Sequence, residues 1–297
     1  MVSTSGNSGT TSGLRVGAAE RMAHDRVPRV TAGEDIHSTY DEALARHYDE
    51  DYEILRSDAG DVRFYRELAL ASGGPVLEVA CGTGRVLLPI ARAGMTVTGV
   101  DPSPTMLDTL RRKLQDEPAA VRERFSLHDG SYASIPLPSA ETPGDHEPYA
   151  LVYSAFRAFQ HLITRDEKVA ALREMARVLA PHGTLAFDVF DYCPVRAAAR
   201  VDEHTDYRVD EGGHVLERRS WSQLLPDRAL ISVIFRWLKD GEETERSAFH
   251  MSITRRDEIE GLLAEAGLRL HALHADFEGA TWSPDNPREL LILARHA

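Results

Sequence analysis

Residues 75–101 have the sequence PVLEVACGTGRVLLPIARAGMTVTGVD, and this stretch decides the fold. Its apolar runs predict strands at Val76–Ala80 and Thr96–Val100, with a helix between them at about Val86–Ala93. The turn Gly82-Thr-Gly84 joins the first strand to the helix. Both strands lack the alternation of a half-exposed strand, so we expect them to be buried on both faces of a parallel sheet.

The same strand and helix alternation extends in both directions from this stretch. A capping box, Thr164 to Glu167, starts a helix that Pro181 and Gly183 are expected to end. The other expected elements are helices within Tyr40–Leu70 and at Met106–Leu114, and strands at Phe125–His128, Tyr149–Ser154 and Thr184–Phe190. The alternation predicts an α/β fold with a doubly wound parallel sheet.

After Phe190 the pattern changes to successive strands. They are expected at His214–Trp221, Ala229–Leu238 and Glu243–Thr254, with turns at Pro226-Asp227 and Asp240-Gly241. This order predicts an antiparallel β insertion after strand five. The remaining expected elements are a helix capped by Thr254 to Asp257 and ending at Gly267, then strands Leu268–Phe277 and Glu289–Ala294.

Three parts are expected along the chain. Residues 1–35 form a flexible leader, because Ser, Thr and Gly fill most of the first positions and offer little apolar surface. Residues 36–195 and 251–297 form the α/β domain. Residues 196–250 form the antiparallel insertion, which we expect to cover the substrate pocket as a lid.

Composition excludes several functional classes. The 297 residues contain 34 Lys and Arg against 47 Asp and Glu, a net charge of −13. This charge argues against broad binding to nucleic acid or to an anionic membrane. There is no secretory apolar segment at the start and no bilayer-spanning run. The two cysteines, Cys81 and Cys193, cannot form a disulfide framework, so we expect a cytoplasmic protein.

The glycine turn lies at the carboxyl end of a parallel strand, where open α/β sheets bind ligands. A dinucleotide site would have a third glycine where Leu87 stands, and a Walker motif is absent. Glu78, four residues before Gly82, suits a ligand with amine and sulfonium groups better than a pyrophosphate. Asp101, the next acid at a strand end, is placed to accept hydrogen bonds from ribose hydroxyls.

A set of motifs in fixed order then points to a family. The set comprises E-x-A-C-G-T-G-R at 78–85, V-D-P-S-P-x-M-L at 100–107, FSLHDGSY, YALVYSAFRAFQHL and LREMARVLAPHGTLAFDVF. It resembles the class I S-adenosylmethionine-dependent methyltransferases. The insertion is similar to that of small-molecule N-methyltransferases of the glycine and deoxyaminosugar types. The resemblance implies a Rossmann-like, mostly parallel seven-stranded sheet and S-adenosylmethionine as cofactor.

The resemblance also implies which residues hold the methionine end of the cofactor. Gly82 and Gly84 would pass beneath it, with Glu78 tuning the turn. Ser154 would lie beside the amino group, and Tyr48 could close over the carboxylate.

The adenosine end is assigned in the same way. Asp101 would bind the ribose, and Met106 would pack on the adenine with Ser103 nearby. Asp129 would accept from the exocyclic amine, and the Gly130 N–H would face a ring nitrogen.

His161 and Tyr52 are the candidate catalytic residues. His161 follows the fourth strand, and histidine suits proton removal near neutral pH. The alternative is that it caps a turn or positions the backbone. Tyr52 shares a helix face with Tyr48, and the related dimethyltransferases have a Y-D-x-x-Y segment that faces the substrate. The alternative for Tyr52 is an aromatic stripe packed on the sheet.

Four further residues are candidate substrate contacts: Arg157, Tyr192, Trp237 and His250. Arg157 could equally pair with a surface acid, and packing is the alternative for the aromatic residues. Cys81 is interpreted as a filler of the turn, because no triad accompanies it. No metal site is expected, because the 13 histidines form no ligand spacing.

The sequence therefore predicts a methyltransferase acting on nitrogen or oxygen of a small molecule, such as a secondary metabolite. The alternatives are a C-methyltransferase or a non-catalytic module that binds S-adenosylmethionine. A nucleotide-dependent oxidoreductase is disfavoured by Leu87 and Glu78. No nucleic-acid or membrane partner is expected, and whether the chain forms a homodimer is left open.

Overall fold

The computed structural model describes residues 42–56, 60–135, 148–190, 203–283 and 289–297, all within one unit, Ile36–Ala297. The expected leader and Tyr192 lie outside these residues. No helix in this described part is long and apolar enough to cross a membrane.

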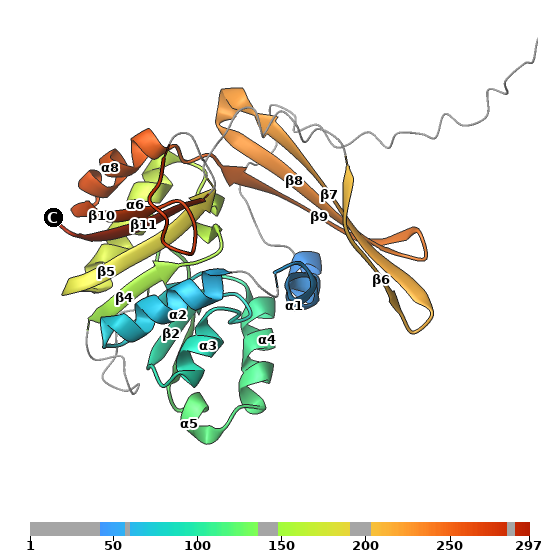
Figure 1. The fold of residues 1–297 in the computed structure, drawn as a ribbon, viewed down its shortest axis with the longest axis horizontal. Helices are drawn as coiled ribbons and strands as arrows, with labels where there is room; N and C mark the ends of the chain where they lie inside the picture. Colours follow the sequence, from blue (N-terminus) through green and yellow to red (C-terminus); the bar gives the residue numbers. More distant parts are fainter. Residues whose placement is uncertain (1–41, 57–59, 136–147, 191–202, 284–288) are drawn as a thin grey trace, which may run out of the picture. The chain divides into compact units, whose positions relative to one another are not determined.

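The main sheet has seven strands in the order β10-β11-β5-β4-β1-β2-β3 (Figure 1). The five strands from β3 to β5 pair in parallel, whereas β11 is antiparallel to β5 and β10 is antiparallel to β11. The strands are β1 Val76–Val79, β2 Val97–Asp101, β3 Phe125–Asp129, β4 Tyr149–Ser154, β5 Leu179–Phe190, β10 Leu268–His274 and β11 Glu289–His296. This topology confirms the predicted Rossmann-like fold. The strand order reverses between β1 and β4, which is where such sheets open a crevice.

Helices cover both faces of this sheet (Figure 1). The helices are α1 Glu42–Arg56, α2 Gly60–Ser72, α3 Leu87–Arg92, α4 Pro104–Gln115, α5 Ala119–Arg122, α6 Arg165–Val178 and α8 Arg256–Glu265, with 3-10 turns η1 Ala158–His161 and η2 Pro226–Arg228. Val76 packs in the cluster formed with α2, α3 and α4. Leu77 packs in the cluster formed with α6 and α8. The four residues of β1 are all buried, as expected for a strand covered on both faces.

A second, antiparallel sheet follows β5 and has the order β6-β7-β8-β9. Its strands are β6 His204–Glu211, β7 His214–Leu225, β8 Leu230–Lys239 and β9 Glu242–Ser252. The insertion predicted after strand five is confirmed, but the sequence prediction omitted β6. This edge strand, HTDYRVDE, is largely exposed and polar, so it carries little of the apolar signal that identifies a strand.

Two helix boundaries differ in detail from the sequence prediction. The Thr164 capping box is present, with the Glu167 N–H donating to Thr164 Oγ1 at 3.2 Å. However, α6 ends at Val178, before Pro181, because β5 already begins at Leu179. The N-cap of α8 is Arg255, whose N–H donates to Glu258, so the prediction of Thr254 was one residue too early.

Candidate functional site

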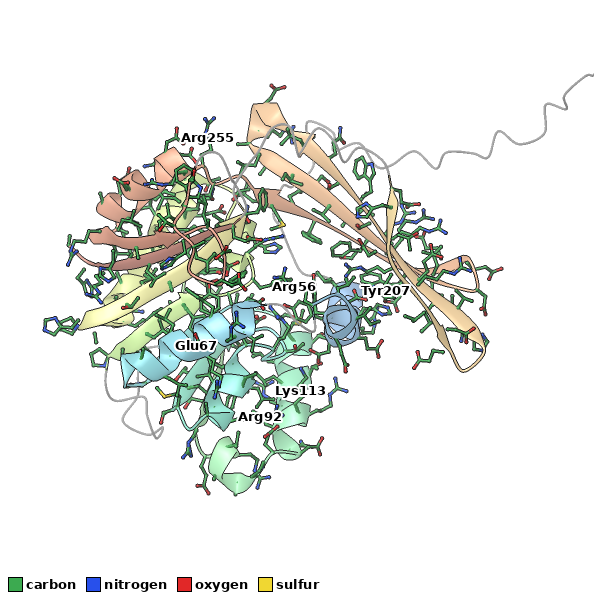
Figure 2. All side chains as sticks on the ribbon, in the orientation of Figure 1. Arg56, Glu67, Arg92, Lys113, Tyr207 and Arg255 are labelled. Atoms are coloured by element: carbon green, nitrogen blue, oxygen red, sulfur yellow. The ribbon has the colours of Figure 1, made fainter. Side chains whose placement is uncertain are left out.

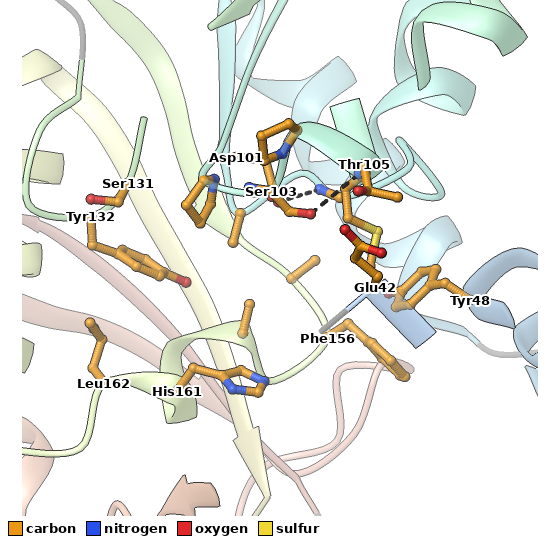
Figure 3. A pocket seen from close by; sticks show the side chains of 17 residues that line it. Glu42, Tyr48, Asp101, Ser103, Thr105, Ser131, Tyr132, Phe156, His161 and Leu162 are labelled. Atoms are coloured by element: carbon orange, nitrogen blue, oxygen red, sulfur yellow. Dashed lines mark hydrogen bonds between the residues drawn. The ribbon is translucent and has the colours of Figure 1, made fainter. Parts of the chain in front are cut away.

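A cavity of about 520 Å³ lies at the carboxyl ends of the central parallel strands (Figure 3). Most of its wall comes from the segments that follow β1, β2, β3 and β4, and α1 supplies the rest. The lining residues are Glu42, Tyr48, Ala80, Gly82, Asp101, Pro102, Ser103, Pro104, Thr105, Met106, Ser131, Tyr132, Ala155, Phe156, Ala158, His161 and Leu162. The cavity therefore occupies the crevice predicted from the strand order.

The two glycines of the turn are needed for different structural reasons. Gly82 has a φ of 53°, lines the cavity, and has only Met106 Sδ within 4 Å of an added Cβ, at 3.9 Å. Gly84 has a φ of 76°, and an added Cβ would lie 2.5 Å from the Leu110 side chain. Gly82 thus opens the backbone to the cavity, whereas Gly84 lets α4 approach the turn.

Asp101 ties the turn after β1 to the start of α4. Its carboxylate accepts the Gly82 N–H at 2.7 Å and the Ser103 N–H at 2.8 Å. Ser103 in turn caps α4 by accepting the Met106 N–H at 3.3 Å. Burial raises the pKa of Asp101, while the two backbone donors favour its charged form. The carboxylate is therefore held at the cavity wall in a fixed orientation.

Glu78 lies behind the turn and does not line the cavity. It is 3% exposed, and the Tyr153 hydroxyl donates to it at 2.9 Å. Burial raises its pKa to about 8, against the lowering effects of the Tyr153 hydrogen bond and of Arg85. A cation bound near the turn would favour its ionised form.

The charge of the wall also favours a cation. The described residues that line the cavity include the acids Glu42 and Asp101 but neither Lys nor Arg. Figure 3 shows the Glu42 carboxylate on the side of the cavity near Tyr48. The sequence prediction missed Glu42, because nothing in its local pattern sets it apart from other acids at a helix start.

The expected adenine contacts are only partly assembled. Asp129 ends β3 opposite Asp101 in the sheet register, but it is not part of the cavity wall. The Gly130 N–H donates to the Asp101 carbonyl at 3.2 Å, so it does not face the cavity as expected. The wall is formed instead by the next two residues, Ser131 and Tyr132.

An aromatic cluster closes one side of the cavity. Tyr48 and Tyr52 contact edge to face with ring centroids 4.7 Å apart, and the same distance separates Tyr52 from Phe156. The guanidinium groups of Arg56 and Arg85 lie 4.8 and 4.6 Å from the centroid of the Phe156 ring. Tyr48 and Phe156 line the cavity, whereas Tyr52 stands behind them. Both of the alternatives considered for Tyr52 are compatible with this packing.

The loop after β4 is held in an uncommon conformation. Phe156 and Arg157 have φ values of 58° and 61°, which are costly for non-glycine residues. The Asp188 carboxylate of β5 accepts both of their N–H groups, at 2.8 and 2.9 Å. Burial raises the pKa of Asp188 to about 6. The Arg157 guanidinium pairs with Glu289 and does not line the cavity. This arrangement agrees with the alternative hypothesis for Arg157, pairing with an acid, and not with a substrate contact.

His161 ends η1 and faces the cavity from the side opposite Asp101 and Ser103 (Figure 3). Its ring packs 5.5 Å from that of Phe249 in β9. Burial lowers its pKa to about 4, so the imidazole is neutral at pH 7 and has an unprotonated ring nitrogen, although the same shift makes it a weaker base than an exposed histidine. The preceding Gln160 fixes the turn by donating to the Ser252 carbonyl at 2.9 Å.

The remaining predicted contacts lie away from the cavity wall. Ser154 is fully buried and hydrogen-bonded to the Tyr132 hydroxyl. Trp237 donates to Asp51 and stacks on His47 at 4.4 Å. His250 is half-buried in β9 and is not among the lining residues.

Of the predicted site residues, the cavity wall thus brings together Tyr48, Gly82, Asp101, Ser103, Met106 and His161. It does not include Tyr52, Glu78, Gly84, Asp129, Gly130, Ser154, Arg157, Trp237 or His250.

Cys81 and the histidines show no sign of other chemistry in the described residues. Burial raises the pKa of the Cys81 thiol, and its sulfur packs against Gly99, where an added Cβ would lie 2.8 Å away. This environment supports the interpretation of Cys81 as a filler. No group of three or more His, Cys, Asp or Glu residues in the described part could hold a metal ion.

Comparison with known proteins gives one matching family and several relatives. A family described as "Methyltransferase domain" matches residues 76–183. The chain is 26% identical over 260 residues to the cypemycin N-terminal methyltransferase of a Streptomyces species, covering 87% of this chain and 98% of that protein. It is also 26% identical over 227 residues to the putative methyltransferase YqeM of Bacillus subtilis, covering 75% of this chain and 84% of that protein.

Two solved structures match most of the chain. The CcbJ methyltransferase from Streptomyces caelestis matches with a TM-score of 0.74 and 26% identity, over 89% of this chain and 100% of that chain. DesVI from Streptomyces venezuelae matches with a TM-score of 0.63 and 22% identity, over 87% of this chain and 100% of that chain, which shows the fold alone.

Proposed function

We propose that this chain, which its similarity to methyltransferases supports as an S-adenosylmethionine-dependent methyltransferase, methylates a nitrogen or oxygen atom of a small molecule, such as a secondary metabolite. The observation that carries the proposal is His161, a neutral imidazole on the cavity wall opposite Asp101. A base in this position suits an acceptor that loses a proton as it is methylated. The name of the cypemycin relative, an N-terminal methyltransferase, adds support for nitrogen.

The cofactor is S-adenosylmethionine, and the residues present fit it. Gly82 leaves the backbone open, Asp101 offers carboxylate oxygens for ribose hydroxyls, and Met106 offers an apolar surface for the adenine. The acidic wall without Lys or Arg among its described residues suits a sulfonium. When bound, the cofactor supplies an electrophilic methyl group.

The residues of this chain then have distinct tasks. His161 accepts the acceptor's proton at an imidazole nitrogen, while Tyr48 and Phe156 exclude water from one side. The lid in this proposal is the antiparallel sheet, whose Phe249 in β9 packs on the His161 ring, although none of its described residues lines the cavity. In this proposal residues 1–35 are a leader, residues 36–195 with 251–297 bind the cofactor, and residues 196–250 form the insertion that covers the substrate.

A screen of acceptors tests the proposal directly. S-adenosylhomocysteine release is measured with a panel of primary and secondary amines, alcohols and phenols. His161→Asn should lower kcat by about 100-fold or more on the best acceptor and leave binding of S-adenosylmethionine unchanged.

Other outcomes select the alternatives. If His161→Asn retains full turnover, the base assignment is wrong. Binding of S-adenosylmethionine without turnover on any acceptor would favour the non-catalytic module. NMR of a product that carries a labelled methyl group identifies the methylated atom, and a new carbon–carbon bond would replace the proposal with C-methylation.

A further inference from the structure

Helix α1 carries a buried carboxylate that none of the roles above uses. Asp51 is 0% exposed and accepts hydrogen bonds from Arg218 at 2.7 Å, from the Tyr207 hydroxyl at 2.8 Å and from Trp237 at 3.1 Å. These three donors come from β7, β6 and β8 of the antiparallel sheet. Figure 2 shows Tyr207 beside α1. A single side chain therefore fastens α1 to three strands.

The same helix is also fastened to the glycine turn. Asp49 accepts the Thr83 hydroxyl at 2.6 Å and pairs with Lys113 Nζ at 2.6 Å. Lys113 additionally donates to the Thr83 carbonyl at 3.0 Å. Thr83 lies between Gly82 and Gly84, so Asp49 binds the turn on which the cofactor is expected to lie.

The two attachments flank the aromatic residues that close the cavity. At 3.6 residues per turn, Tyr48 and Tyr52 share one face of α1, with Asp51 on one side of that face and Asp49 on the other. Arg218 lies 5.8 Å from the centroid of the Tyr52 ring, so the buried ion pair also sets the position of this ring. Any displacement of α1 would move the turn contact, the tyrosines and the sheet contact together.

We propose that Asp49 and Asp51 are positioning residues, and that α1 couples the cofactor turn to the antiparallel sheet through them. When the turn is ordered by its ligand, α1 is held more firmly, and the antiparallel sheet attached to Asp51 is held with it. The inference rests on the proposed function only in taking the glycine turn as the cofactor site. It assigns no chemistry to either carboxylate.

Hydrogen exchange with S-adenosylhomocysteine as the probe tests this coupling without an acceptor. In the wild type, the probe should slow amide exchange in 76–115 around the turn, in α1 and in β6. Asp49→Ala cuts the link to the turn and leaves the Asp51 network intact. In this variant, exchange of the free protein in β6 should be unchanged, 76–115 should still be protected, and the protection of β6 by the probe should be lost.

Asp51→Asn should also abolish the protection of β6 by the probe. It should weaken binding of S-adenosylhomocysteine by about tenfold, which lies within the usual range of coupling between sites. If it unfolds β6, Tyr207→Phe removes only one donor and should reduce the protection of β6 by the probe with the strand intact. Arg46→Gln is the matched control, because Arg46 pairs α1 with Glu245 of the same sheet in an exposed ion pair.

Three results are decisive. Protection of β6 that is equal in the wild type, Asp49→Ala and Tyr207→Phe would overturn the coupling. The coupling would also be overturned if Arg46→Gln lost as much protection of β6 by the probe as Asp49→Ala. Absence of any protection in 76–115 of the wild type would instead refute the proposed cofactor site, which separates the two failures.

Discussion

Burial decides the protonation of the ionisable residues around the cavity. It keeps His161 neutral by lowering its pKa to about 4, and it favours neutral Glu78 by raising its pKa to about 8. The cause is the same in both cases, since a poorly hydrated site disfavours the charged form. The two residues therefore predict opposite dependences on pH.

For His161 the prediction concerns activity. The acid limb of kcat/KM that belongs to this base should have its midpoint below 6, near 4, because the folded protein resists protonating the imidazole. The profile should be measured from pH 3 to 9 for the wild type and for His161→Asn, with an acceptor that does not titrate in this range. A limb that persists unchanged in the variant belongs to another group.

For Glu78 the prediction concerns stability. Its pKa is higher in the folded state than the ordinary 4.5, so its contribution is fully present below pH 4.5 and is lost as pH rises through about 8. Within that window, the free energy of unfolding falls by at most about 1.4 kcal/mol for each pH unit. Denaturant unfolding of the ligand-free protein should therefore show that Glu78→Gln loses less stability than the wild type between pH 5 and 8. Parallel curves would contradict the raised pKa.

Gly84 gives a test of steric fit at the residue scale. An added Cβ would lie 2.5 Å from Leu110, and the φ of 76° disfavours any side chain. Gly84→Ala should lower the free energy of unfolding by about 1–3 kcal/mol and weaken binding of S-adenosylmethionine. Gly94→Ala is the matched control, since Gly94 has a φ of 100° but nothing within 4 Å of an added Cβ. Equal losses would assign the effect to φ alone.

At the scale of elements, local rules fix where helices begin. The Thr164 capping box satisfies two backbone donors at the start of α6, with Glu167 accepting the Thr164 N–H at 2.7 Å. The pair of left-handed residues after β4 follows no such local rule, because Asp188 of β5 holds both N–H groups from 32 and 31 positions away. Sequence can predict the first feature but not the second.

The cap gives the prediction at this scale. Thr164→Ala should lower the free energy of unfolding by about 1 kcal/mol, because the Glu167 N–H loses its acceptor. Thr164→Ser should retain most of that stability. Thermal or denaturant unfolding measures both variants, and an Ala variant as stable as the wild type would show that the cap contributes nothing.

At the scale of the whole described unit, a buried ion pair joins the antiparallel sheet to α1. Arg218 and Asp51 are 4% and 0% exposed, and Asp206 also accepts from Arg218 at 2.9 Å. Removing one partner leaves a buried charge, which costs much more than losing an exposed pair.

Arg218→Ala should therefore lower the free energy of unfolding by about 3–5 kcal/mol. Arg246→Ala should change it by less than about 1 kcal/mol, because Arg246 pairs with Glu243 at the exposed surface of the same sheet. Denaturant unfolding compares the two variants. Similar losses would show that the Asp51 pair is not a special attachment.

The sequence by itself determined the alternating strands and helices, the antiparallel insertion, the glycine turn and the type of cofactor. These features are encoded locally, by apolar periodicity, by glycine at left-handed positions and by a motif set in fixed order. The sequence also selected His161, Asp101 and Met106, which all line the cavity. Its errors at β6 and at the start of α8 fell on a polar edge strand and on a helix whose N-cap, Arg255, makes no side-chain cap hydrogen bond.

Only the tertiary structure decided which of the candidate residues line the cavity and which lie outside its wall. Trp237 and Arg157 looked like substrate contacts, but they are directed at Asp51 and Glu289, partners that lie 186 and 132 positions away. Glu42 entered the wall because α1 folds against the segment after β2. Contacts over such separations depend on how elements pack and on which buried charges must be paired, and no local pattern in the sequence records that.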